Sequence, residues 1–250
     1  MSVQPNGEDE ILYGRNAVLE YLKSGEAMKK VLLERDKFSD TTSDIVALLR
    51  DCGVPYRFVD RTTLNRLCEG RHQGVIAYVE EFSYRDVDDI LEAARAQGED
   101  PFILALDGVE DPHNLGALIR TAEAAGVHGV IIPARRSARV TPAVVKVSAG
   151  AAAHVAVARV TNLVQTLKYL QNQGCWIWGA EMDGLDVRKV DLTGSLVWVL
   201  GSEGKGLSRL VRESCDQIVS LPMKGKTGSL NVSVAGGVLL YETFLRRIPE

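Results

Sequence analysis

The sequence predicts an α/β protein in two parts: a small N-terminal α/β domain, and a larger C-terminal domain built on a mostly parallel sheet. Helix-like and strand-like segments alternate along the chain, and after residue 100 the strand-like segments become almost continuously apolar. Strands that helices cover on both faces have this composition, whereas strands with one wet face alternate apolar and polar residues. Hydrophobic residues make up 46% of the chain and charged residues 25%, which indicates a folded globular protein.

The N-terminal domain is expected at residues 11–82, after a disordered tail at residues 1–10. Apolar side chains recur there at helical spacing, and the short apolar runs between them are typical of strands. The expected order is a helix at 13–25, a strand at 29–34, a helix at 43–53, a strand at 55–59, a helix at 61–68 and a strand at 74–82.

Residues 83–100 are expected to connect the two domains. They hold six acidic residues against two basic ones, Arg85 and Arg95, and could form one helix. A run of acidic residues usually marks a solvated face. We therefore interpret this segment as a linker rather than a binding site.

The C-terminal domain is expected at residues 101–250. Apolar runs predict its strands at 102–107, 129–133, 155–160, 175–182, 196–201 and 217–222. Helices are predicted at 115–126, 141–152, 162–174 and 206–214, and the last helix from about Ser229 to Arg247. Trp176, Trp178 and Trp198 lie in apolar strands, so we expect them in the core.

The uneven charge of the chain bears on its partners. A net charge of −4 argues against binding nucleic acid by bulk charge alone, but residues 101–250 carry 16 basic against 13 acidic residues. Contact with nucleic acid would therefore depend on local basic patches. The N-terminal domain offers one candidate patch, although a merely solvated face would have the same composition. It consists of Arg57, Arg61, Arg66, Arg71 and His72.

The remaining composition predicts a cytoplasmic protein with no metal and no membrane partner. The cysteines Cys52, Cys68, Cys175 and Cys215 form no CxxC pair, so we interpret them as reduced thiols. No apolar run approaches the roughly 20 residues that span a bilayer. The polar and acidic start, MSVQPNGEDE, lacks the features of a secretory or mitochondrial leader.

Three turns after predicted strands are rich in glycine and polar residues, at 107–126, 199–208 and 221–237. Ligands of parallel sheets bind where strands end, so these turns are the candidate site. Taken singly, Asn114 and Ser229 would be helix caps and Arg120 an exposed helix charge, while Glu203 stands out more in its glycine loop. Gly201, Gly204 and Gly206 have the wrong order for a dinucleotide fingerprint, which disfavours a nucleotide-dependent oxidoreductase.

Taken together, NLGALIRTAEAAG, GSEGKGLS and SLNVSVA resemble the three signature motifs of the SpoU branch of the SPOUT methyltransferases, over residues 101–247. YGRNAVLEYL and RHQGVIAYV resemble the start and end of the small substrate-binding domain of the ribosomal RNA members. The resemblance implies S-adenosylmethionine-dependent methylation of a ribose 2′-hydroxyl, at a guanosine of large-subunit (23S) rRNA. It also implies a trefoil knot in the C-terminal domain, and a homodimer formed through the knot region and the last helix.

The resemblance also assigns the site residues. Gly201, Leu221 and Leu230 would hold the cofactor, and Gly204 and Gly206 would let the backbone approach it. The catalytic residues would be Arg120, Asn114, Glu203, Ser229 and Asn231. Because a guanidinium stays protonated at ordinary pH, we expect Arg120 to clamp the RNA and stabilise the developing alkoxide rather than act as a base.

Two alternatives remain open within this interpretation. One is a tRNA ribose 2′-O-methyltransferase, which the extra N-terminal domain disfavours because the tRNA guanosine enzyme of the family lacks one. The other is a non-catalytic rRNA-binding assembly factor, which the full set of motif residues disfavours.

Overall fold

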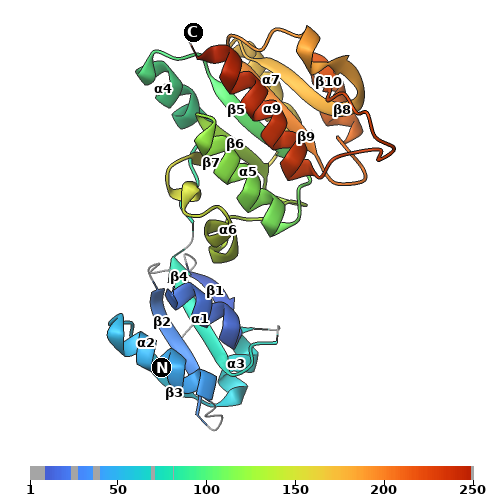
Figure 1. The fold of residues 1–250 in the computed structure, drawn as a ribbon. Coiled ribbons are helices and arrows are strands. Elements are labelled where there is room, and N and C mark those ends of the chain that lie inside the picture. Colours follow the sequence, from blue (N-terminus) through green and yellow to red (C-terminus); the bar gives the residue numbers. More distant parts are fainter. Residues whose placement is uncertain (1–8, 24–27, 36–39, 69–70, 81, 249–250) are drawn as a thin grey trace. The chain divides into compact units, whose positions relative to one another are not determined.

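The computed structural model describes residues 9–23, 28–35, 40–68, 71–80 and 82–248 (Figure 1). The chain divides between Ser83 and Tyr84 into two compact units. None of the described helices is long and apolar enough to cross a membrane.

In its described residues, the N-terminal unit is a four-stranded sheet with three helices. Its elements are β1 (Asp9–Tyr13), α1 (Arg15–Lys23), β2 (Met28–Glu34), α2 (Asp40–Asp51), β3 (Tyr56–Val59), α3 (Arg61–Leu67) and β4 (Val75–Glu80). The strand order is β1-β4-β2-β3, with β4 antiparallel to both of its neighbours and β2 parallel to β3. Helices α1 and α2 pack on one face and α3 on the other.

Strand β1 was not predicted, and it corrects the expected tail at residues 1–10, of which 1–8 lie outside the described residues. The strand pairs along its whole length with β4, for example Ile11 with Tyr78. Its polar start has no strand signal of its own, because the partner that stabilises it lies almost 70 residues later in the chain.

One of the five residues of the predicted basic patch, His72, does not lie on the surface of this unit. His72 is buried: its Nε2 lies 2.8 Å from Asn65 Oδ1, and its Nδ1 accepts a hydrogen bond from the Gly74 amide at 3.0 Å. Both ring nitrogens are therefore occupied within the protein. The four arginines Arg57, Arg61, Arg66 and Arg71 are exposed.

The C-terminal unit is a six-stranded sheet between helices, and all its described strand pairs are parallel. Its elements are α4 (Val87–Gln97), β5 (Phe102–Asp107), α5 (Pro112–Ala124), β6 (Gly129–Pro133), α6 (Pro142–Val147), β7 (Ala156–Val160), α7 (Leu163–Asn172), β8 (Trp176–Asp186), β9 (Leu196–Gly201), α8 (Arg209–Glu213), β10 (Gln217–Ser220) and α9 (Val232–Arg247). The strand order is β10-β8-β9-β5-β6-β7.

Alternate side chains of these strands point to opposite faces of the sheet. Ile103 and Ala105 of β5 face a cluster that includes residues of α4, α7 and α8. On the opposite face α5 and α9 lie side by side (Figure 1), and the indole of Trp198 donates to Thr243 Oγ1 of α9 at 2.9 Å. A Cβ at Gly236 would stand 2.5 Å from Leu118, so glycine is required for the close approach of α5 and α9.

Residues 83–100, expected to be a linker, contribute α4 to the C-terminal unit instead. Ile90, Leu91 and Ala94 of this helix are buried, and a Cβ at Gly129 on β6 would stand 2.4 Å from Ile90. The acidic residues of the helix are exposed, as predicted for a solvated face. The helix packs against the sheet because its few apolar residues lie on one side. The high content of acidic residues obscured this pattern in the sequence.

Of the three tryptophans expected in the core, Trp178 and Trp198 are buried, whereas Trp176 is 58% exposed. Trp176 is the first residue of β8. The prediction was wrong there because the end of a strand need not be covered by the helices that bury its middle.

Candidate functional site

Three side chains from distant parts of the chain meet at the starts of α5 and α9. The Asn231 amide nitrogen Nδ2 donates to Asn114 Oδ1 at 3.0 Å and also to Glu203 Oε1. Asn114 and Asn231 are 117 positions apart in the sequence. The two amides and the carboxylate form one hydrogen-bonded group, which we call the Asn–Asn–Glu cluster (Asn114, Asn231, Glu203).

The helix starts determine where the two asparagines lie. Asp111 is the N-cap of α5 and accepts the His113 amide at 2.9 Å, so Asn114 lies in the first turn of the helix and is not its cap. Asn231 is the N-cap of α9, and its Oδ1 accepts the Ser233 amide at 2.9 Å. The predicted helix start at Ser229 is therefore too early. Ser229 is exposed and precedes the cap.

The loop that carries Glu203 folds back on itself. Ser202 and Gly206 exchange two backbone hydrogen bonds, at 3.1 and 2.9 Å. Gly204 and Gly206 have φ values of 79° and 66°, in the region that favours glycine. A Cβ at Gly201 would stand 2.1 Å from the Gly206 carbonyl carbon. These three predicted glycines are therefore required by the turn.

Two carboxylates hold the residues that follow this turn. Glu181 Oε1, in the middle of β8, accepts the Leu207 amide at 2.9 Å, and Asp107 Oδ2, at the end of β5, accepts the Ser208 amide at 2.6 Å. Arg212 of α8 donates to Glu181 Oε2 at 2.6 Å and to Asp183 Oδ2 at 2.8 Å. None of these four side chains was predicted from the sequence. Asp107 and Glu181 could be noticed only as charged residues that follow an apolar run, and Arg212, in a helix, had no such signal.

Two cavities flank the loop. Cavity A, of about 740 Å³, is lined by all five residues that the sequence analysis assigned to a cofactor, and by Ser229 and Asn231. Cavity B, of about 850 Å³, is lined by Asn114 and by residues from the carboxyl ends of β5, β6 and β7. The cavities share Ser202, Glu203, Lys205, Gly206 and Val232. Glu203 therefore stands on the wall between two spaces of ligand size.

Arg120 is the one predicted catalytic residue that the structure does not bring to this site. It is exposed on α5, lines neither cavity, and makes no hydrogen bond or ion pair with the described residues. Each helical residue turns the side chain by about 100°. Six positions after the buried Asn114, Arg120 therefore points away from the sheet.

The thiols do not contribute reactive groups here. Burial raises the pKa of Cys215 to about 12 and that of Cys175 to about 11, so both stay protonated at neutral pH. In the described part of the chain, no group of three or more His, Cys, Asp or Glu side chains could hold a metal ion.

Comparison with known proteins identifies this architecture. The SpoU rRNA Methylase family matches residues 101–241, and the RNA 2′-O ribose methyltransferase substrate-binding family matches residues 11–85. This chain belongs to the SpoU methyltransferase family. The enzyme is 42% identical to a TrmH family tRNA/rRNA methyltransferase of Bacillus subtilis, YacO, over 97% of its own length and 98% of the relative.

Solved structures agree with this assignment. The SpoU methyltransferase AviRb from Streptomyces viridochromogenes, in complex with AdoMet, matches with a TM-score of 0.63 and 25% identity, over 96% of this chain and 91% of AviRb. A TrmH/SpoU tRNA-modifying enzyme from A. aeolicus matches with a TM-score of 0.53 and 33% identity, over 59% of this chain and 75% of that one. The enzyme is an RNA methyltransferase with S-adenosylmethionine (AdoMet) as its cofactor.

Cavity A suits this cofactor. Its apolar side chains Leu221 and Leu230 can cover an adenine, and a Cβ at Gly204 or Gly228 would meet nothing within 4 Å, so the backbone there is open to a ligand. The carboxylate of Glu203 lines the same space and can face a cationic group. AdoMet supplies an electrophilic methyl group carried on a sulfonium.

Proposed function

We propose that this enzyme methylates the 2′-oxygen of a ribose in large-subunit (23S) rRNA, at a guanosine, as a cytoplasmic homodimer. The cofactor binds in cavity A and the target nucleotide in cavity B. One observation carries the proposal: the Asn–Asn–Glu cluster stands where the two cavities share a wall. Methyl transfer requires the acceptor oxygen and the methyl donor to approach in line, and adjoining cavities allow that alignment.

The cluster orients the acceptor. Oδ1 of Asn114 is engaged by Asn231, which leaves the Asn114 Nδ2 to donate to a ribose oxygen. Glu203 holds the Asn231 amide in place and presents its remaining acceptor capacity to the substrate. Ser229, at the rim of cavity A, offers a further hydroxyl to the same region. These groups position the nucleotide before the reaction, so less orientational entropy is lost in reaching the transition state.

As the 2′-oxygen bonds to the methyl carbon, the carbon–sulfur bond of AdoMet would break, S-adenosylhomocysteine would leave, and the hydroxyl proton would pass to solvent water. We assign stabilisation of the negative charge that develops on the oxygen to Arg120. Because Arg120 lines neither cavity of its own subunit, a partner subunit must supply it. Arg120 is a clamp in this scheme: a fixed positive charge close to the alkoxide lowers the barrier without accepting a proton.

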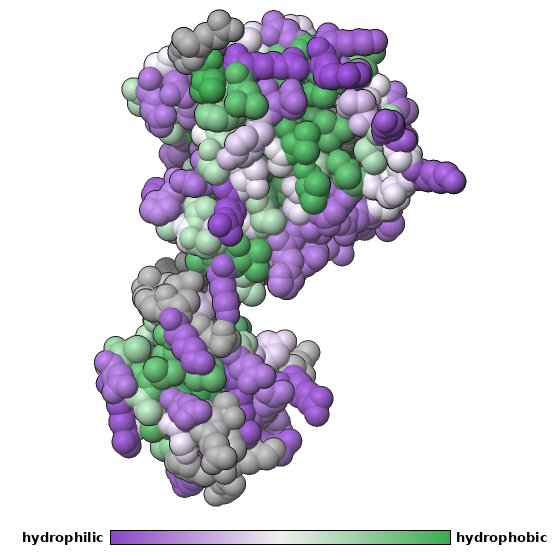
Figure 2. All heavy atoms as spheres, viewed as in Figure 1, coloured by the Kyte–Doolittle hydropathy of each residue, from purple (hydrophilic) through white to green (hydrophobic). Residues whose placement is uncertain are grey.

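The outer face of α9 supports the homodimer. Val234, Val238, Tyr241, Leu245 and Ile248 are between 41% and 59% exposed and recur at helical spacing. Figure 2 shows hydrophobic residues along this helix on the face in view. A contiguous exposed apolar face usually marks a protein interface. We expect the chain around cavity A to carry the trefoil knot that the family resemblance implies.

The choice of rRNA over tRNA rests on the N-terminal unit. The substrate-binding family matches residues 11–85, whereas the A. aeolicus tRNA-modifying enzyme covers only 59% of this chain.

The choice of guanosine rests on Glu110, an exposed carboxylate on the wall of cavity B. Guanine presents N–H donors that a carboxylate can accept.

The test combines two measurements. Ribose methylation is mapped in rRNA from cells that lack the protein, and purified enzyme with radiolabelled AdoMet is given that rRNA or bulk tRNA. We expect one unmethylated 23S guanosine, and label transfer to it that the Glu203→Gln variant lowers about 100-fold. Transfer to tRNA alone would support the tRNA enzyme instead. Binding to rRNA without any transfer would support an assembly factor.

A further inference from the structure

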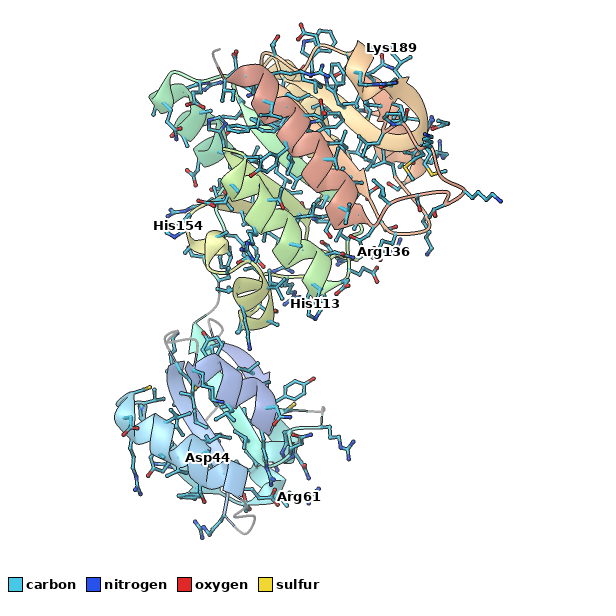
Figure 3. The ribbon with its side chains drawn as sticks, viewed as in Figure 1. Asp44, Arg61, His113, Arg136, His154 and Lys189 are labelled. Atoms are coloured by element: carbon cyan, nitrogen blue, oxygen red, sulfur yellow. The ribbon has the colours of Figure 1, made fainter. Side chains whose placement is uncertain are left out.

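The loop between β6 and α6 places two arginines on cavity B that the assigned site does not use. We call residues 134–139 the arginine loop. Arg135 and Arg136 line the cavity and are exposed, and neither has a hydrogen bond or ion pair with any described residue. Arg136 and His113 lie toward the same end of the C-terminal unit, where α5 begins (Figure 3).

The arginine loop is held rigidly. The Ala138 amide donates to the Val109 carbonyl at 2.8 Å, and Arg159 donates to the Ala134 carbonyl at 3.1 Å. Just beyond the loop, the Val140 amide donates to the Tyr84 hydroxyl at 3.0 Å. The two arginines are thus presented from a backbone that is fixed at both ends.

Arg136 has a φ of 54°, in the left-handed region that non-glycine residues rarely adopt. Such strain persists only where the surroundings enforce it, and it concentrates at ligand sites. A glycine would relieve the strain at this position. The presence of an arginine at this strained position therefore indicates that its side chain has a role.

The four carboxylates on the wall of cavity B form no ion pair with these arginines; they are Asp107, Glu110, Asp111 and Glu203. Asp107 accepts the Ser208 amide and Asp111 accepts the His113 amide, so both carboxylates are engaged by the protein backbone. Two fixed guanidinium groups beside a cavity favour an anion, and a guanidinium matches the geometry of phosphate oxygens. The cavity also adjoins the cofactor space, as expected for a nucleotide within a chain.

We propose that Arg135 and Arg136 bind an RNA phosphodiester next to the target nucleotide and so position its ribose at the Asn–Asn–Glu cluster. This inference rests on the proposed function, because it takes RNA to be the occupant of cavity B. The two arginines contribute to RNA affinity and to alignment, and cofactor binding does not depend on them.

The experiment compares Arg135→Gln, Arg136→Gln and the double variant with Arg139→Gln, an exposed arginine of the same loop that does not line cavity B. RNA affinity is measured against NaCl concentration, AdoMet affinity by calorimetry, and methyl transfer in single turnovers. We expect the double variant to lose tenfold or more in RNA affinity, and its salt slope to fall by about 0.7 for each lost contact with single-stranded phosphate. The double variant should keep the AdoMet affinity of the wild type. The Arg139→Gln variant should match the wild type in all three measurements.

Arg136→Gly separates side chain from backbone strain. We expect its thermal stability to equal or exceed that of the wild type while RNA affinity falls, because glycine accepts the positive φ. An unchanged salt slope in the double variant, or an equal loss in Arg139→Gln, would overturn the inference. If inorganic phosphate competed with RNA and bound as tightly as RNA does, the arginines would form a site for free anions instead. Wild-type enzyme that transfers no methyl to RNA would refute the proposed function itself.

Discussion

Asn231 donates a hydrogen bond to Asn114 at 3.0 Å, and so ties the start of α9 to the start of α5. The other end of the same amide caps α9 through the Ser233 and Val234 backbone nitrogens. One side chain therefore both begins a helix and supplies the bond around which the candidate site is built. A substitution that separates these two tasks can show which of them the reaction needs.

Asn231→Asp is that substitution. Aspartate caps helices as well as asparagine does, but it cannot donate to Asn114 or Glu203. We expect the single-turnover rate to fall about 100-fold, while the thermal midpoint stays within a few degrees of the wild type. Asn231→Ala is the control: it should also lose about 1 kcal/mol of folding stability, because the cap is removed. A near-normal rate for Asn231→Asp would show that the bridge to Asn114 has no part in the reaction.

Glu181 should control cofactor affinity through the loop that it holds. Removing its carboxylate in Glu181→Ala frees the Leu207 amide and leaves Arg212 with only Asp183. We expect the AdoMet dissociation constant, measured by calorimetry, to rise about tenfold, which corresponds to about 1.4 kcal/mol. Glu213→Ala is the matched control, because its ion pair with Arg209 is exposed and should contribute little. Equal AdoMet affinity in both variants would contradict the assigned role.

Subunit mixing can test whether Arg120 acts on the partner's site. Arg120→Ala and Glu203→Gln homodimers should each be nearly inactive. After the two are unfolded and refolded together in equal amounts, half of the dimers are mixed, and each mixed dimer has one complete site. Transfer should then return to about a quarter of the wild-type rate. If Arg120 served its own subunit, or if the enzyme were a monomer, no mixture would recover activity.

His128 should make the enzyme less stable in mild acid. Burial lowers the pKa of His128 below its ordinary value of 6.5, although Glu99, 3.4 Å from Nε2, opposes the shift. Below pH 6.5 the unfolded chain binds a proton at this position that the folded chain resists. The stabilising contribution is therefore complete above pH 6.5 and is lost progressively as the pH falls toward the folded-state pKa.

The measurement is the thermal midpoint between pH 7.5 and 5.5. His128→Gln, in which the new amide oxygen can still accept the Phe102 amide, should show a smaller decrease than the wild type. His154→Gln, at an exposed histidine, should follow the wild-type curve. If His128→Gln and the wild type gave parallel curves, burial of this histidine would not explain the acid sensitivity.

Local pattern was enough to predict most of the fold. Buried parallel strands are recognisable from continuous apolar runs, and the helices between them from helical spacing, because both signals lie within one segment. The glycines of the 201–206 loop were singled out through the family resemblance, and the structure shows that the turn requires them. Asn114, Glu203 and Asn231 could be grouped in advance only through the family resemblance.

Long-range contacts decided the rest. β1 exists because β4 pairs with it, and the Glu181 and Asp107 carboxylates matter because folding places them beside Leu207 and Ser208. The direction of Arg120 depends on which side of α5 the sheet buries. The sequence by itself thus determined most of the helices and strands, though not β1, and which residue types gather at the strand ends. Only the tertiary structure decided which side chains meet there, because hydrogen bonds and burial depend on distances in space rather than along the chain.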